Sequence, residues 1–306
     1  MTDLKFFKGA PSWKHTCYVL GVPRSGKSTT LNLIGSVDRV EVLDEPFEIQ
    51  VIAQKGGEYL PGSETYEEYI DSYMAVLENS VSELVLGRRY NFRKNDKSCV
   101  FNIKPLSHVD NAFSRSRRLD AIDYCKSADL ILAMAFNDLE KSLPFLLDDR
   151  IPNPKIIHVV RDVEECVAEV DQKSWLSDEQ LSKLTNLSPG YNFVQSKKGK
   201  NIYIPYTVDE RHVNKFISAG NRDRALMFIR AQHDQLQLGL SMIDSVPILK
   251  VMYDSLVNDP KGMMTEIFSF MGVEPTETSS HILEKIISNR HEKTDLKSQP
   301  NSPNPR

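Results

Sequence analysis

The chain has 306 residues, which is enough for one large α/β domain or two small ones. Hydrophobic residues make up 40% of the chain and charged residues 26%, a balance that allows a sizeable core in a soluble protein. The net charge of −4 and the pI near 6.0 argue against a general nucleic-acid binder. We therefore expect no nucleic-acid partner, and positive potential only locally, in a site.

The four cysteines lack the spacing of a metal site, and most lie in or beside apolar runs. This pattern predicts buried free thiols in place of disulfides or metal ligands. The N-terminal residues lack the apolar core of a signal peptide, and no apolar run approaches the length of a membrane span. The expectation is a cytoplasmic protein with no membrane span.

The clearest local signal is the stretch YVLGVPRSGKSTTLNLI, residues 18–34. An apolar, β-prone run enters a short glycine-containing loop, and apolar residues at helical spacing follow, so we expect a strand, a tight loop and a helix start. Unsatisfied N–H groups and the helix dipole attract anions at such a point. Arg24 and Lys27 add positive charges, and Ser28 and Thr29 add hydroxyl donors. The stretch predicts a phosphate-sized anion site.

Two interpretations of this loop remain open on its residues alone. The letters GVPRSGKS, residues 21–28, fit the Walker A pattern of nucleoside triphosphate binding. The letters PRSG, residues 23–26, followed by hydroxyl residues, resemble the 5′-phosphosulfate loop of sulfotransferases. The rest of the chain has to decide between them.

Alternating strand and helix patterns follow along the chain. Besides the first strand and helix, strands are predicted over 40–43, 98–105, 129–135, 155–160 and 248–253, and helices over 66–86, 115–126, 139–149, 162–170, 223–242 and 262–271. This alternation predicts an α/β fold, a P-loop-like parallel sheet flanked by helices in three α/β/α layers.

The domain organisation follows from composition. Residues 171–223 are polar, with one predicted strand at 202–205, and are interpreted as an insertion or lid of a single domain spanning 1–295. The tail 296–306 is predicted to be disordered.

Several polar residues lie at or just past the predicted strand ends. Ligands of open parallel sheets bind beyond the carboxyl ends of the strands. We therefore expect one shared rim formed by Arg24, Glu45, Lys104, Arg161 and Tyr253.

Residues 155–170, KIIHVVRDVEECVAEV, resemble the 3′-phosphate-binding segment of sulfotransferases. YDSLVNDPKGMMTEIFSFMGVEP, residues 253–275, strongly resembles the family's C-terminal region. Residues 143–154 and 223–240 agree with the family in the same order. These separated blocks cover about half of the chain, so the sequence is similar to the PAPS-dependent sulfotransferases.

The resemblance implies a donor, 3′-phosphoadenosine-5′-phosphosulfate (PAPS), and no metal. It also implies transfer of a sulfuryl group to a hydroxyl or amine of a small-molecule, carbohydrate or lipid acceptor. By position, Arg161 would hold the 3′-phosphate. The 5′-phosphosulfate would be held by Arg24, Ser25, Gly26, Lys27, Ser28 and Thr29.

Two positions depart from the family pattern. Glu169 stands where the family usually has a serine on the 3′-phosphate, and a carboxylate there would repel a phosphate. Lys27 replaces a usual threonine and is the lysine of a Walker A loop. The alternatives are a P-loop kinase or NTPase that uses ATP and Mg²⁺, and a non-catalytic nucleotide-binding relative.

The catalytic candidates are the cations Arg24, Lys27 and Lys104 and two possible bases, Glu45 and His108. A base must accept the proton of the acceptor. Glu45 follows the second strand, where it either serves as this base or pairs with a basic residue. His108 follows the predicted strand of Lys104 and is either a base or a surface loop histidine. Aromatic residues within 66–86 and 171–223 face either an acceptor or the core.

Overall fold

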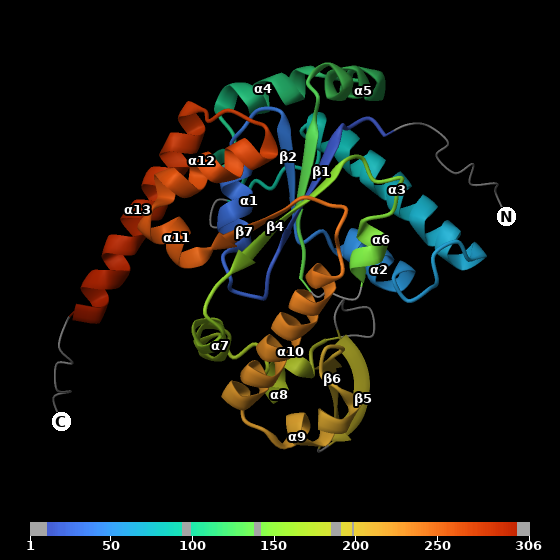
Figure 1. The fold of residues 1–306 in the computed structure, drawn as a ribbon, viewed down its shortest axis with the longest axis vertical. Coiled ribbons are helices and arrows are strands. Elements are labelled where there is room, and N and C mark those ends of the chain that lie inside the picture. The colour runs from blue at the N-terminus through green and yellow to red at the C-terminus, as the bar shows by residue number, and fades with distance from the viewer. Residues whose placement is uncertain (1–10, 94–98, 138–141, 185–190, 198, 299–306) are drawn as a thin grey trace.

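A five-stranded parallel sheet runs through the centre of the molecule (Figure 1). The computed structural model describes residues 11–93, 99–137, 142–184, 191–197 and 199–298. The strand order is β2-β3-β1-β4-β7, and every neighbouring pair is parallel. The strands are β1 (His15–Leu20), β2 (Val40–Asp44), β3 (Ile131–Ala135), β4 (Pro154–Val160) and β7 (Ile248–Met252). The predicted parallel α/β sheet is confirmed.

Helices cover both faces of this sheet. Successive side chains of a strand point to opposite faces, and here both faces carry apolar residues that must be buried. Cys17 and Val19 of β1 face one apolar cluster, and Tyr18 and Leu20 face the other. On the first face lie α1 (Lys27–Gly35), α11 (Tyr253–Asn258), α12 (Pro260–Met271) and α13 (Glu277–Ser298). On the second lie α2 (Phe47–Gly56), α3 (Glu64–Val85), α5 (Arg118–Ser127) and α6 (Leu143–Leu146). In Figure 1 the two layers flank the sheet, as the three-layer prediction requires.

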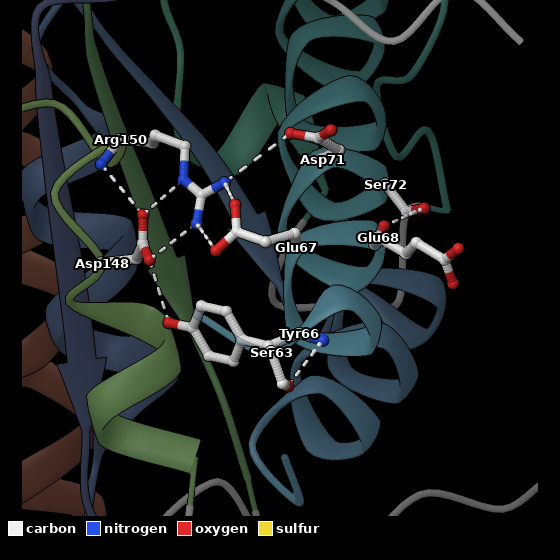
Figure 2. Close-up of polar contacts among 8 residues, drawn as sticks. All are labelled: Ser63, Tyr66, Glu67, Glu68, Asp71, Ser72, Asp148 and Arg150. Carbon is white, nitrogen blue, oxygen red and sulfur yellow. Dashed lines mark hydrogen bonds and ion pairs between the residues drawn. The ribbon is translucent and has the colours of Figure 1, made fainter. Parts of the chain in front are cut away.

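The start of α3 is fixed to the turn before β4 by a polar cluster (Figure 2). Ser63 caps the helix by accepting from the backbone N–H of Tyr66. The hydroxyl of Tyr66 donates to Asp148 at 2.9 Å, and Arg150 donates to both Asp148 and Glu67 at 2.7 Å. Tyr66 is thereby held in the apolar core. This aromatic residue of the predicted 66–86 helix therefore faces the core.

The segment interpreted as a polar insertion gathers at one end of the sheet, in the lower half of Figure 1. It lies between α7 (Val163–Gln172) and α10 (Asn221–Ser241), and consists of α8 (Asp178–Leu181), the antiparallel pair β5 (Tyr191–Lys197) and β6 (Lys200–Pro205), η3 (Glu210–His212) and α9 (Val213–Ser218). It forms an apolar cluster with α7 and α10. Buried Arg224 joins its parts by donating to the carbonyls of Leu176 and Phe216.

The predicted strand over 98–105 is wrong. Among the described residues, this region forms η1 (Val100–Asn102) and then α4 (Leu106–Ser114). Val100 and Ile103 are buried and Phe101 is exposed, which is the spacing of one helical turn. Pro105 occupies the N-cap position of α4. The apolar residues therefore follow the spacing of a helical turn and not the alternation of a strand.

Other element boundaries also differ from the predictions. The helix expected over 139–149 is reduced to α6, and its first positions, 139–141, lie outside the described residues. Helix α2 was not predicted. Helix α13 continues to Ser298, so the predicted disorder is wrong for 296–298, while 299–306 lie outside the described residues.

All four cysteines are buried and free, which confirms the prediction made for them. Within the described ranges, no helix combines the length and the apolar character needed to cross a membrane.

Candidate functional site

The loop between β1 and α1 forms the floor of the site. Gly26 occupies the N-cap position of α1 with φ +107°, a backbone angle that side chains with a Cβ rarely adopt. A Cβ at Gly26 would lie 2.5 Å from Cδ2 of Tyr253, so the loop and this ring are in close contact. Lys27 folds back, and its Nζ donates to the carbonyls of Gly21 at 2.6 Å and Val22 at 3.0 Å. The N–H groups of the first helical turn therefore face the loop above a buried positive charge.

A cavity of about 270 Å³ opens above this loop. It brings together residues that follow all five strands of the sheet with residues of α7 and the turn after it, which are far apart in the sequence. Its lining consists of Pro23, Arg24, Gly26, Lys27, Ser28, Thr29, Glu45, Asn137, Arg161, Glu169, Trp175 and Tyr253.

Two lining residues other than glycine hold positive φ angles, Arg24 at +69° and Glu45 at +49°. Such backbone conformations cost about 1–3 kcal/mol each and persist only where the surroundings hold them. The carbonyl of Arg24 accepts from Arg161 at 3.0 Å, and the N–H of Glu45 donates to the carbonyl of Ala135 at 3.0 Å. Both side chains are thus aimed into the cavity by a backbone that is tied to neighbouring elements.

Glu169 bridges the two arginines of the cavity. Nε of Arg24 donates to one carboxylate oxygen at 2.8 Å, and Arg161 donates to the other at 2.7 Å. Burial alone would raise the pKa of Glu169, but the hydrogen bonds from Arg161 and Arg24 outweigh it and hold that pKa below its ordinary value. The carboxylate is therefore charged at neutral pH, and it accepts hydrogen bonds from both guanidinium groups.

Aromatic rings cover the other sides of both arginines. The guanidinium of Arg161 lies 4.5 Å from the ring centre of Tyr253, and that of Arg24 lies 5.8 Å from the ring centre of Trp175. Both distances are within the range of cation–π attraction. The two rings limit where each guanidinium can move.

Two acidic groups complete the rim near β2. Glu45 follows the strand, is exposed to the cavity and accepts a hydrogen bond from the side-chain amide of Asn137. Asp44 accepts from the hydroxyl of Ser28 at 3.4 Å. In the part of the chain that the structure describes, no group of three or more His, Cys, Asp or Glu side chains is arranged to hold a metal ion.

Most residues predicted for the site do line this cavity. Those placed there are Arg24, Gly26, Lys27, Ser28, Thr29, Glu45 and Arg161, together with the rim residue Tyr253. Ser25 differs, because its side chain is fully buried beneath the loop, where a Cβ on Gly21 would lie 2.5 Å from its Oγ. The hydroxyl of Ser25 is therefore not offered to a ligand in the cavity.

Lys104 and His108 are not part of this site, so their predicted positions on the rim are wrong. Nζ of Lys104 donates to the carbonyls of Val37, at 2.8 Å, and of Val40 at the start of β2. Nε2 of His108 lies 3.0 Å from a carboxylate oxygen of Glu41. Figure 1 shows α4, which carries His108, at the opposite end of the molecule from α7. Both side chains belong to a buried polar cluster behind the edge strand.

No role was predicted for Asn137, which lies two residues past the end of β3, at the same edge of the sheet as Glu45. The signal was present as the first polar residue after a buried apolar strand. Trp175 is one of the aromatic residues within 171–223 that were expected to face either an acceptor or the core, and its contact with Arg24 joins residues 151 positions apart. No periodicity encodes such a contact.

The sequence matches one protein family over nearly its whole length. The family is described as "Sulfotransferase domain", and its profile matches residues 15–303. No curated protein matches the chain.

Similar solved structures include the sulfotransferase domain of the olefin synthase from Synechococcus PCC 7002, with 16% identity, 96% of this chain and 88% of that chain covered, and a TM-score of 0.41. Another is sulfotransferase STF1 from Mycobacterium tuberculosis H37Rv, with 14% identity, 89% and 71% covered, and a TM-score of 0.43. A sulfotransferase from Alicyclobacillus acidocaldarius has 12% identity, 94% and 95% covered, and a TM-score of 0.39. On the match over residues 15–303, the chain belongs to the sulfotransferase domain family.

Proposed function

We propose that the protein transfers a sulfuryl group from PAPS to a hydroxyl or amine of a small-molecule, carbohydrate or lipid acceptor. The observation that carries this proposal is the convergence of Arg24, Lys27, Arg161 and the N-terminus of α1 on one cavity of about 270 Å³. Such a site suits a nucleotide with more than one anionic group. Family membership supports sulfuryl transfer as the reaction.

The loop is proposed to hold the 5′-phosphosulfate. Backbone N–H groups at the start of α1 and the hydroxyls of Ser28 and Thr29 would bind its oxygens, with Arg24 and Lys27 supplying charge. Arg161 is proposed to bind the 3′-phosphate. The loop contributes Gly26 through its backbone alone, and the buried side chain of Ser25 is left out of the contacts.

In the transfer step, an acceptor oxygen or nitrogen attacks sulfur and forms a new bond to it. The bond from sulfur to the bridging oxygen breaks, and its electron pair stays on that oxygen, which leaves as part of the 5′-phosphate. Negative charge therefore grows beside Arg24 and Lys27. A preorganised donor at such a position contributes about 3–4 kcal/mol to transition-state stabilisation in other group-transfer sites.

Glu45 is proposed as the base that accepts the proton of the acceptor. It is the exposed carboxylate at the rim next to the loop, and its positive φ together with Asn137 fixes its direction. The other acidic side chains of the lining and its neighbourhood, Glu169 and Asp44, already accept from arginines and from Ser28. A positioned base contributes about 10²- to 10⁴-fold to such reactions.

One observation favours a second function, a P-loop kinase or NTPase. Ser28 and Asp44 lie within hydrogen-bond distance, and a hydroxyl with an aspartate is the pair that holds Mg²⁺ in P-loop NTPases. The match to the sulfotransferase domain over residues 15–303 favours the first function.

Calorimetric titration separates the two functions. Adenosine 3′,5′-bisphosphate, the product nucleotide, should bind without Mg²⁺, and at about 100 times its Kd it should stabilise the fold by about 2.7 kcal/mol. Arg161→Ala should weaken this binding measurably but by less than about tenfold, because the hydrogen bond that it makes to the phosphate replaces one that it already makes to Glu169.

Arg211→Ala is the matched control, since this exposed arginine pairs with Asp209 away from the cavity. It should leave the affinity unchanged. Tight, Mg²⁺-dependent ATP binding without bisphosphate binding would refute the sulfotransferase proposal and support the kinase or NTPase.

A further inference from the structure

The cavity contains two places for an anion, and the protein already fills one of them. The first lies at the N-terminus of α1, over the loop that carries Lys27. The second lies between Arg24 and Arg161, where the carboxylate of Glu169 accepts at 2.8 Å and 2.7 Å. We propose that Glu169 determines donor specificity, because any second phosphate of a bound nucleotide must displace its carboxylate from this arginine pair.

The proposal rests on the function proposed above, since it assumes that the cavity binds a nucleotide. A phosphate and a carboxylate compete for the same guanidinium donors, because both accept two parallel hydrogen bonds from an arginine. The side chains of Arg161 and Glu169 are 11% and 21% exposed, so their contact is only weakly screened by water. The exchange therefore removes one strong ion pair for each one it forms.

The consequence is a donor site that gains little from a second phosphate. The wild-type protein should bind adenosine 3′,5′-bisphosphate less than about tenfold more tightly than adenosine 5′-monophosphate, which lacks that group. A residual preference remains, because a phosphate dianion carries more charge than the carboxylate that it replaces.

Glu165 provides a matched comparison on the same arginine. It also pairs with Arg161, at 2.9 Å, but its side chain is 51% exposed and it does not line the cavity. If only the negative charge next to Arg161 matters, nucleotide affinity should change in variants of both glutamates. If the carboxylate matters because it occupies the anion position, the affinity should change only in the Glu169 variant.

The experiment measures the affinity of both nucleotides for the wild-type protein, Glu169→Gln and Glu165→Gln by calorimetry. Glu169→Gln keeps the size of the side chain and removes its charge. It should tighten binding of the bisphosphate about tenfold or more and of the monophosphate less than about threefold. Glu165→Gln should change both affinities less than about threefold. Melting curves of the three proteins confirm that each is folded.

Equal tightening of both nucleotides by Glu169→Gln would overturn the proposal, and so would weaker bisphosphate binding, which would make Glu169 a support for the arginines. Either result leaves the sulfotransferase proposal standing as long as the bisphosphate binds the wild-type protein. Failure of both nucleotides to bind any of the three proteins refutes the proposed function itself and removes the basis of this inference.

Discussion

Replacing Gly26 by alanine tests whether the loop and Tyr253 are packed as the structure shows. The substitution places a Cβ at φ +107°, 2.5 Å and 2.9 Å from two carbons of the Tyr253 ring. A left-handed backbone costs a residue with a Cβ about 1–2 kcal/mol. Overpacking a tight contact adds about 1–3 kcal/mol. We expect Gly26→Ala to lower the free energy of unfolding by about 2–5 kcal/mol.

Urea unfolding followed by tryptophan fluorescence measures the loss, and Gly62→Ala is the control for backbone strain alone. Gly62 also has a positive φ, +81°, but its Cβ would meet no atom within 4 Å. It should cost only about 1–2 kcal/mol. In a Tyr253→Ala background the clash at Gly26 disappears, so the double-mutant cycle should show a coupling of about 1–3 kcal/mol. Equal costs for the two glycine variants, with a coupling below about 0.5 kcal/mol, would refute the described packing.

Two further predictions concern groups outside the cavity. Burial, together with Lys250 and His233, lowers the pKa of His158 from 6.5 to about 4. The unfolded chain takes up this proton first, so stability should fall by about 3 kcal/mol as the pH drops from about 6.5 to about 4. In urea unfolding at pH 7.5 and 4.5, His158→Gln should lose that part of the pH dependence, and exposed His281→Asn should keep it. Lys104→Met should cost about 1–3 kcal/mol of stability, because two buried carbonyls lose their donor, and should leave the affinity for adenosine 3′,5′-bisphosphate unchanged. A tenfold weaker affinity in that variant would contradict this placement and indicate that Lys104 contributes to the donor site.

The sheet and the loop could be predicted from sequence because their signals are local. The strand of residues 155–160 carries apolar residues on both faces of the sheet, Ile156 on one and Ile157 and Val159 on the other, as expected for a strand buried on both faces. The loop residues from Arg24 to Thr29 are contiguous, so the strand before them and the helix after them place most of them at one point. Arg161 was found for the same reason, since it directly follows a buried strand.

The positions of Lys104 and His108 could not be predicted, because short apolar runs are ambiguous in period. Cys99, Val100 and Ile103 fit a strand by letter, yet their burial follows a helical turn. Once this turn is helical, Lys104 points to the start of β2 and α4 carries His108 to Glu41. Because one helical turn was predicted as a strand, Lys104 and His108 were both expected at the cavity, whereas they lie near the start of β2.

Glu169 shows a different limit, because its meaning depends on a contact across the fold. In the sequence it appeared as a charge that would repel a phosphate near Arg161. The structure adds Arg24 as a second partner, so the carboxylate of Glu169 occupies the position that the phosphate of a ligand would take. The residue type was informative, but the competition that it creates required the three-dimensional arrangement.

The positive charges of the cavity are already engaged by acceptors of the protein itself. Lys27 donates to two loop carbonyls, and Arg24 and Arg161 share the carboxylate of Glu169. Binding an anion here is therefore an exchange of hydrogen bonds, and only the difference between the old and the new acceptors contributes to affinity. Loop carbonyls are neutral and a carboxylate carries one charge, so a ligand gains most by presenting more charge than these acceptors do. A cavity arranged in this way should prefer phosphate and phosphosulfate groups over simple carboxylates, and this selectivity comes from the resting contacts as much as from the arginines.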